Sequence, residues 1–253
     1  MKKLSIIILI GFIFFIGCDK NKDKNRTEPD NNTTDNIMPF KVGNFWNYVD
    51  SSFADDGTFL NEDYSKLGIS GKETINYKGK QIEMYYWNWY DMNTYEPRES
   101  KWLVTNESTG IYFYGGKYYN KNFVFEKSLS IKFPVVAGES WQKINYSSYS
   151  SDSTFKVSDT VTISCVSVSE KFQTDAGNLD CYVYHYPSNS LYGPSDTYIY
   201  YAVNVGYVGL IMKYNGQVVY KKKMTNYSLQ KFNQQNTTSK SKSTNKNYYN
   251  EFN

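Results

Sequence analysis

The sequence predicts an all-β protein, with a single antiparallel β domain of about ten to twelve strands folded as a curled sheet, a half-barrel or a sandwich. Aromatic residues make up 18% of the 253 residues and include 26 tyrosines, and aromatic side chains favour strands. Turn signals such as Lys78-Gly79 and Asn215-Gly216 separate short alternating runs, as in sequential hairpins. No segment has a sustained apolar period near 3.6 residues, so we expect no long helix.

The N-terminal segment has the features of an export signal. Two lysines precede an apolar run from Leu4 to Ile16, which is shorter than the ~20 residues of a membrane-spanning helix and fits the ~7–15 apolar residues of a signal peptide. The run ends at Gly17-Cys18, which resembles the bacterial lipoprotein signal, where a small residue precedes an obligatory cysteine. Phe15 departs from that signal, because leucine is usual there. We therefore expect residues 1–17 to be a signal peptide and Cys18 to carry acyl chains that bind a membrane.

Two other segments cannot form a core. Residues 18–36 hold no aliphatic or aromatic residue after the cysteine and predict a flexible tether, and residues 231–253 form a low-complexity tail. The β domain between them, residues 37–230, has 18 basic and 19 acidic side chains, a net charge of −1. A near-neutral domain without a basic patch argues against a nucleic-acid partner. The predicted location is the bacterial cell envelope, on a membrane, with the outer membrane and its periplasmic or surface face expected.

Two segments of the predicted domain begin alike. "FKVGNFWNYV" and "FPVVAGESWQKI" each have a phenylalanine, then Gly-x-x-Trp, then a strand-like run, so Gly43 matches Gly138 and Trp46 matches Trp141. A glycine before each strand indicates a tight turn, and each tryptophan can then cover an end of the core. We interpret the two segments as similar strand starts on two halves of one sheet system.

Four segments carry a resemblance to a known group of proteins: "PFKVGNFWNYV", "FPVVAGESW", "TDAGNLDCYVYHY" and "YYAVNVGYVGLIMK". In this order they resemble blocks of a loose group of uncharacterised bacterial envelope proteins and lipoproteins, with Gly-x-x-Trp strand starts, an Ala-Gly hairpin and a closing Val-Gly-x-Val strand. The resemblance covers residues 38–215. Asp175 stands where proline is usual, and Asn178-Leu179 replace Thr-Phe. The resemblance implies a β-rich domain outside the cytoplasm and carries over no catalytic residues.

The sequence lacks the residue sets and motifs of the common enzyme classes. His185 is the single histidine, which excludes a multi-histidine zinc site and makes it a required member of any Ser-His-Asp triad. It shares one face of a regular strand with Leu179, Cys181 and Val183, which we expect to face inward, so we interpret it as structural. The sequence has no P-loop, Gly-x-Gly-x-x-Gly or Cys-x-x-Cys motif. It predicts no catalytic residues, no metal site and no cofactor, and leaves enzymatic activity undecided.

The acidic residues keep one enzymatic alternative open. Asp63, Glu83, Glu99 and Glu170 are far apart in the sequence and could include the two carboxylates of a glycosidase in space. Scattered surface carboxylates are the ordinary interpretation of such a pattern. Clustering of these residues in a cleft would favour the enzyme.

Two cysteines remain after lipidation, and an oxidising envelope invites a disulfide between Cys165 and Cys181. The hairpin geometry argues against it. If the turn centres on Ala176-Gly177, the cross-strand neighbour of Cys181 is approximately Phe172. Cys165 is about seven residues further along that strand, which is over ~20 Å at ~3.3 Å per residue. A disulfide needs a Cα separation below ~7 Å, so we expect two free, mostly buried thiols.

The aromatic run "MYYWNWYDMNTY" is the best candidate for a binding surface. Tyr85, Trp87 and Trp89 fall on one face of a strand, where an exposed ladder could stack on sugar rings or fill a partner's groove. The other interpretation is a core face, because the opposite face, from Met84 to Tyr90, is also half apolar. We keep these three residues as candidate ligand-binding residues.

These observations predict a membrane-anchored envelope lipoprotein with a non-enzymatic β-rich binding or structural domain. Two alternatives are a carbohydrate-binding or carbohydrate-acting accessory protein and a carrier of a hydrophobic ligand. Besides the membrane, the candidate partner is a glycan or a protein. An exposed aromatic face without a cleft would favour surface binding, whereas a closed apolar cavity would favour the carrier.

Overall fold

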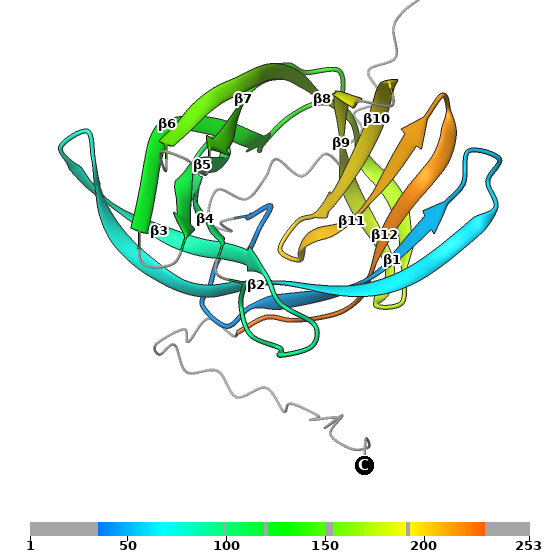
Figure 1. The fold of residues 1–253 in the computed structure, drawn as a ribbon, viewed down its shortest axis with the longest axis horizontal. Helices are drawn as coiled ribbons and strands as arrows, with labels where there is room; N and C mark the ends of the chain where they lie inside the picture. The colour runs from blue at the N-terminus through cyan, green and yellow to red at the C-terminus, as the bar shows by residue number, and fades with distance from the viewer. Residues whose placement is uncertain (1–34, 99, 119–120, 150–153, 191–192, 231–253) are drawn as a thin grey trace, which may run out of the picture. The chain divides into compact units, whose positions relative to one another are not determined.

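The domain is one antiparallel sheet of twelve strands, as the sequence predicted. The computed structural model describes residues 35–230 except for residues 99, 119–120, 150–153 and 191–192. Across the sheet the order is β6-β5-β4-β3-β2-β1-β12-β11-β10-β9-β8-β7. The sheet curls until its two edge strands come side by side (Figure 1). The strands are β1 (Phe45–Phe53), β2 (Phe59–Tyr77), β3 (Lys80–Trp89), β4 (Lys101–Glu107), β5 (Gly110–Tyr118), β6 (Lys121–Lys132), β7 (Ser140–Tyr149), β8 (Thr154–Thr174), β9 (Gly177–Ser190), β10 (Gly193–Ala202), β11 (Gly206–Tyr214) and β12 (Gln217–Ser228).

Several predicted features lie outside the described residues: the signal peptide of residues 1–17, the lipidation site Cys18, the tether up to residue 34 and the tail of residues 231–253. The last residue of the predicted tether, Asn36, is described, and its Oδ1 accepts hydrogen bonds from the backbone N–H two residues later at 3.1 Å and from the Asn106 side chain at 2.7 Å. In the part of the chain that is described, no helix is long and apolar enough to cross a membrane.

Local turn chemistry places the hairpins where the sequence predicted them. Lys78 and Gly79 join β2 to β3, and Asn215 and Gly216 join β11 to β12. All four residues have positive φ angles, from 49° to 81°, as the two-residue type I′ hairpin turn requires. The third turn, predicted to centre on Ala176-Gly177, lies one residue earlier, at Asp175 and Ala176, so Gly177, with φ at 128°, is already the first residue of β9.

The two similar strand starts open two similar halves of the sheet, β1–β6 and β7–β12. The Gly43 N–H donates to the Ile69 carbonyl at 2.9 Å, and the Ile69 N–H donates to the Asn44 carbonyl at 2.9 Å. Gly138 and Cys165 repeat this pair of bonds in the second half, at 2.7 and 2.8 Å. Both glycines have positive φ, 92° and 87°. The halves meet where β1 pairs with β12, so the predicted two-half organisation is confirmed.

In each half, the tip of the longest hairpin contacts the last strand of that half: β2–β3 contacts β6, and β8–β9 contacts β12. Lys78, at the tip of β2–β3, lies 2.7 Å from the Glu126 carboxylate of β6. Asp175, at the tip of β8–β9, lies 2.6 Å from the Lys223 ammonium of β12. Each hairpin contributes to a small apolar cluster on the side of the sheet away from the central core. The buried members of these clusters are Ile75, Met84, Leu103 and Tyr114 in the first half, and Phe172, Cys181, Val183, Tyr200, Ala202 and Val208 in the second.

The inward face of β9 differs from the predicted one. The pattern predicts that Cys181, Val183 and His185 face inward, but the central core contains Tyr184 and the tyrosines two residues on either side of it. Cys181 and Val183 are buried as well, in the small cluster of the second half. Because β9 is covered on both faces, apolar alternation cannot tell which face meets the larger core.

The central core is built from strands of both halves. Trp46 is fully buried, and its Nε1 donates to the Val205 carbonyl at 2.6 Å. Residues 37–40, which precede β1, bury three apolar side chains in the same core. Trp141 is half-buried and meets Tyr184 edge to face, with ring centroids 5.8 Å apart. The predicted buried anchor is therefore confirmed at Trp46, whereas Trp141 is covered only in part.

Side chains join the edge strands β6 and β7. The buried Ser128 hydroxyl donates to the Ile144 carbonyl and accepts from the Ile144 N–H, each at 2.9 Å. The Tyr146 hydroxyl donates to the Glu126 carbonyl at 2.9 Å. These contacts close the curl (Figure 1). Inward-facing side chains from strands far apart in sequence therefore surround a single interior space.

Candidate functional site

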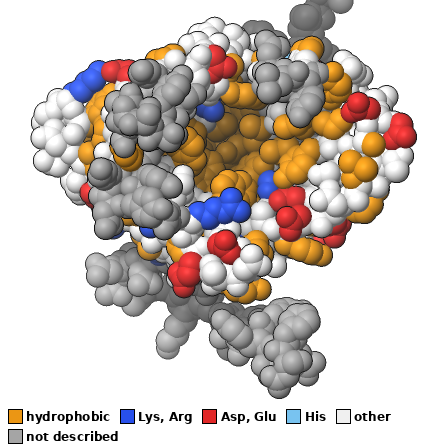
Figure 2. Space-filling model, in the orientation of Figure 1, with side chains coloured by type: hydrophobic (Ala, Val, Ile, Leu, Met, Phe, Trp, Pro, Cys, Tyr) orange, Lys and Arg blue, Asp and Glu red, His pale blue; other side chains and the backbone are white. Residues whose placement is uncertain are grey.

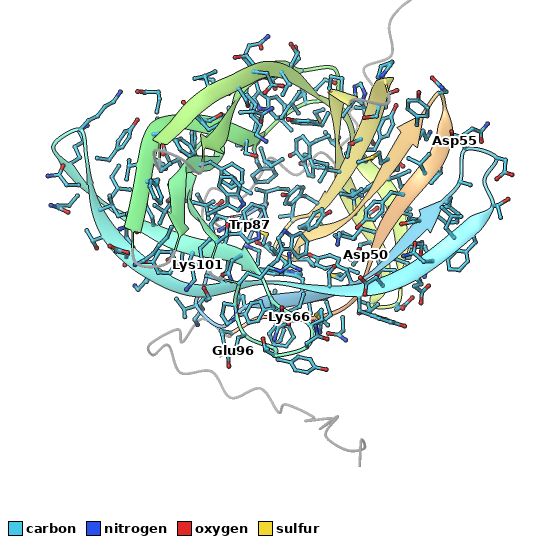
Figure 3. All side chains as sticks on the ribbon, viewed as in Figure 1. Asp50, Asp55, Lys66, Trp87, Glu96 and Lys101 are labelled. Atoms are coloured by element: carbon cyan, nitrogen blue, oxygen red, sulfur yellow. The ribbon has the colours of Figure 1, made fainter. Side chains whose placement is uncertain are left out.

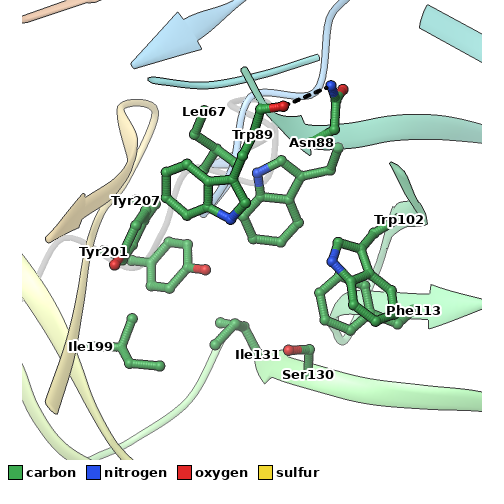
Figure 4. Close-up of a pocket in the computed structure, with 11 residues that line it drawn as sticks. Leu67, Asn88, Trp89, Trp102, Phe113, Ser130, Ile131, Ile199, Tyr201 and Tyr207 are labelled. Atoms are coloured by element: carbon green, nitrogen blue, oxygen red, sulfur yellow. Dashed lines mark hydrogen bonds between the residues drawn. The ribbon is translucent and has the colours of Figure 1, made fainter. Parts of the chain in front are cut away.

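An aromatic cavity of about 220 Å³ lies inside the curled sheet. Figure 2 shows an apolar hollow at the centre of the domain, and Figure 3 places Trp87 there. The close-up in Figure 4 shows side chains from both halves of the sheet around the cavity. The lining residues are Leu67, Trp87, Asn88, Trp89, Trp102, Phe113, Ser130, Ile131, Ile199, Tyr201 and Tyr207.

Strand β3 supplies two of the three predicted binding residues. Tyr85, Trp87 and Trp89 alternate with Met84 and Asn88, so they share the inward face of the strand. Trp87 and Trp89 line the cavity. Tyr85 does not line it and stacks on the Phe40 ring, with centroids 5.8 Å apart. The aromatic run is therefore a half-buried inner wall. It is neither a fully exposed binding face nor a fully buried core face, the two interpretations that the sequence left open.

The rest of the aromatic wall comes from residues that sequence reasoning missed. The Trp102 ring of β4 stacks on the Phe113 ring of β5 at 5.6 Å and 30°, and Phe113 also meets Trp87 at 5.7 Å. Trp102 is 39% exposed, the most exposed lining residue, so it lies nearest to solvent. Tyr201 and Tyr207 complete the opposite side from β10 and β11. Only the pairing of distant strands brings these side chains together.

The lining of the cavity has no charged side chain, and its buried amide is already hydrogen-bonded. Asn88 is buried; its Oδ1 accepts from the Ser70 hydroxyl at 2.7 Å and its Nδ2 donates to a backbone carbonyl at 3.2 Å. Burial raises the pKa of Tyr201 and Tyr207 well above the ordinary value, so both hydroxyls are neutral at physiological pH. Nε1 of Trp87 is buried in the wall with no hydrogen-bond partner among the described residues.

A buried ion pair lies behind the wall. Nζ of Lys222 is 2.6 Å from Oδ1 of Asp50 and 2.6 Å from the Ser65 hydroxyl. It also lies 4.4 Å from the centroid of the Trp89 ring. Burial lowers the pKa of Lys222, and Asp50 acts in the opposite direction by stabilising the ammonium. The pair fixes Trp89 from behind and leaves no net charge at this side of the cavity.

The other residues considered for chemistry lie apart from the cavity. His185 is on the opposite face of β9 from Tyr184, and its Nε2 is 2.7 Å from Oδ1 of Asp196. Glu83 forms an exposed ion pair with Lys72, and Glu170, in the other half, accepts from a tyrosine hydroxyl. Glu99 lies outside the described residues. The described residues contain no group of three or more His, Cys, Asp or Glu side chains that could hold a metal ion.

Both cysteines of the domain are free and buried, as the sequence predicted. Cys181 lies opposite Glu170 in the β8–β9 ladder, two residues from the predicted partner. Burial raises the pKa of Cys181 to about 12 and also raises the pKa of Cys165. Since the thiolate is the reactive species, both thiols are unreactive in the folded protein.

Thiol labelling of the Cys18→Ser variant should therefore give different counts in its folded and denatured states. Without reductant, we expect the native protein to react slowly and the denatured protein to take up two equivalents of a thiol reagent. The second count follows from the absence of a disulfide between Cys165 and Cys181. Zero equivalents after denaturation would mean that the two cysteines are bonded, and would contradict the observed strand register.

The chain matches no protein-family model and none of the curated proteins. Two solved structures resemble its fold. One is from Bacteroides fragilis and is named as an exported protein with a YmcC-like fold; it is 14% identical, with a TM-score of 0.39 over 76% of this chain and 98% of its own. The other is from Parabacteroides distasonis and is named as a lipoprotein; it is 12% identical, with a TM-score of 0.37 over 77% of this chain and 99% of its own.

Proposed function

We propose that this chain is a bacterial envelope lipoprotein, held to a membrane through acyl chains on Cys18, whose β domain binds a small apolar ligand in the aromatic cavity. Among the functions that the sequence left open, this is the carrier of a hydrophobic ligand. The observation that carries it is the inward ring of aromatic side chains around an unfilled volume of about 220 Å³. Burying an apolar ligand there removes its surface from water, worth about 25 cal/mol per Å².

The size and chemistry of the wall define the ligand class. Typical small-molecule pockets measure about 300–1,000 Å³, so this cavity fits a ligand of one or two rings. Aromatic rings prefer offset-stacked or edge-to-face contacts with other rings, and the stacked pair of Trp102 and Phe113 provides such a surface. A planar, largely apolar molecule satisfies these contacts best.

A carbohydrate fits the same wall less well. Each sugar hydroxyl buried without a partner costs free energy, and the amide of Asn88 is already bonded within the wall. A glycan ligand would have to remain at the exposed edge, where Trp102 could stack on one sugar ring. Apolar binding inside the cavity therefore ranks first and glycan binding second.

Trp102→Ala tests the cavity as the binding site. Because Trp102 is 39% exposed, its removal should cost little stability while opening the wall on one side. We expect affinity for a neutral probe, 2-naphthamide, to fall about tenfold in calorimetric titration. Tyr95→Ala removes an aromatic side chain that is 67% exposed and does not line the cavity, and it should bind the probe as the wild type does. Equal affinity in both variants, or binding of simple sugars in place of the probe, would contradict apolar binding in this cavity.

Cys18→Ala tests the anchor. The apolar run that ends at Gly17-Cys18 supports lipidation, and the lipid modification requires the thiol. Cells given a radioactive fatty acid should label the wild-type protein, whereas the variant should stay unlabelled and accumulate with its signal peptide attached. As a matched control, Cys165→Ala should be labelled like the wild type. Undiminished label on Cys18→Ala would rule out this anchor and would not affect the proposal that the cavity binds a ligand.

A further inference from the structure

Comparison of the two halves of the sheet identifies an unusual residue in its interior. Tyr48 and Lys143 each stand two residues after the matched tryptophans, Trp46 and Trp141. In the first half Tyr48 is fully buried, and its hydroxyl donates to a backbone carbonyl of β11 at 2.8 Å. In the second half the same inward position holds a lysine.

The register of β7 confirms that Lys143 points inward. Its cross-strand neighbour in β8 is Val161, and the pair two residues earlier is Trp141 with Ile163. These three apolar side chains belong to the central core or pack against it. Since cross-strand neighbours share one face of a sheet, the ammonium group of Lys143 is directed into the curl.

Aromatic rings surround this ammonium group. Nζ of Lys143 lies 5.0 Å from the centroid of the Tyr186 ring and 5.7 Å from that of Phe113, within the ~6 Å range of cation–π attraction. Among the described residues, no carboxylate is within 4.0 Å of it. Asp159 of β8 is the acidic group that favours its charged form. Lys222, on β12 of the same half, has the Asp50 carboxylate at 2.6 Å, whereas Lys143 has no carboxylate this close among the described residues.

Phe113 links Lys143 to the cavity. This ring lines the cavity and contacts both Trp87 and Trp102. A ligand stacked on the aromatic wall therefore lies on a ring that the ammonium group also contacts. An ammonium held away from water is costly without a counter-charge, and an anionic ligand would supply one.

We propose that the ligand of this cavity is an apolar ring compound bearing a carboxylate, and that Lys143 pairs with that carboxylate. The inference rests on the proposed function, since it assigns a chemical class to the ligand of the same cavity. The rings of Trp87, Trp102 and Phe113 take the apolar part. Lys143 selects the acid over its uncharged analogues.

Paired probes of equal shape test this selection. We expect the wild-type protein to bind 2-naphthoate about tenfold more tightly than the neutral 2-naphthamide in calorimetric titration at pH 7. Lys143→Met should bind both probes equally, because it keeps the bulk of the side chain and removes the charge. Lys143→Arg should retain a preference for the acid. Lys80→Met, which removes an exposed lysine outside the cavity, should behave as the wild type.

The pH dependence supplies a second readout. Burial lowers the pKa of Lys143 from 10.5 to about 8, so its positive charge is present below pH 8 and is lost as the pH rises through that value. Tyr186 stays neutral over this range because burial raises its pKa. The preference for naphthoate should therefore decline between about pH 7 and pH 9, whereas a lysine with an ordinary pKa would hold it to pH 10.

The outcomes separate the two proposals. Equal binding of both probes by the wild type, or a preference that Lys143→Met retains, would overturn the role of Lys143 and leave apolar binding standing. If neither probe binds, both proposals are overturned. A preference lost in Lys143→Met, kept in Lys143→Arg and declining near pH 8 supports the carboxylate assignment.

Discussion

Asp50→Asn should lower the free energy of unfolding by about 3–5 kcal/mol, as breaking a buried ion pair does in general. The Asp50 and Lys222 side chains are 13% and 7% exposed, with 2.6 Å between Oδ1 and Nζ. Without the carboxylate, the ammonium group beside the Trp89 ring keeps its charge only at a high desolvation cost. Urea denaturation of the wild type and the variant measures the loss.

The exposed ion pair between Lys72 and Glu83 provides the matched control. Its atoms are 2.7 Å apart, nearly as close as those of the buried pair, but its side chains are 52% and 47% exposed. Glu83→Gln should cost less than ~1 kcal/mol, because exposed ion pairs contribute little. Adding Lys222→Met to Asp50→Asn should recover much of the stability, since the unpaired charge is then gone. Equal losses for Asp50→Asn and Glu83→Gln would contradict the buried pair.

Trp46→Ala should cost about 3–5 kcal/mol, the usual loss when a buried aromatic side chain is removed from a core. Trp46 is fully buried and bonds the backbone of the β10–β11 turn through Nε1. It therefore joins the start of β1 to a distant part of the sheet. Denaturant midpoints of Trp46→Ala and of the matched Trp141→Ala measure the difference.

Trp141→Ala should cost less, because Trp141 is only half-buried and its Nε1 has no hydrogen-bond partner among the described residues. Trp87→Ala and Trp89→Ala should be milder than Trp46→Ala, since both side chains border the cavity. Wild-type stability in Trp46→Ala would contradict its place in the core. Equal losses in all four variants would make the aromatic run of β3 an ordinary core face.

Much of the fold could be predicted because its signals are local. The residues at Lys78-Gly79 and Asn215-Gly216 accept the positive φ angles of their turns, so the hairpins follow from the sequence. The matched Gly43 and Gly138 mark the two halves for the same reason. The pairing of β1 with β12 has no such signal, because it depends on the closure of strands far apart in the chain.

The site could be predicted only in part. The alternation in β3 places Trp87 and Trp89 on one face, but Trp102, Phe113 and Tyr201 come from separate strands and carry no shared motif. Burial on both faces of several strands hides which aromatic residues point into the curl. A residue-by-residue comparison of the two halves, beyond the matched tryptophans, shows that Lys143 occupies the position that Tyr48 has in the first half.

The central claim is that the interior of the sheet is a binding site for an apolar ring. A crystal of the protein soaked with bromobenzene tests it most directly, because the anomalous signal of bromine locates the ring without reference to any assumed pose. We expect a bromine peak inside the curl, within van der Waals contact of Trp87, Trp102 or Phe113. No peak there at saturating probe, or bromine only on the outer faces of the sheet, would contradict the claim.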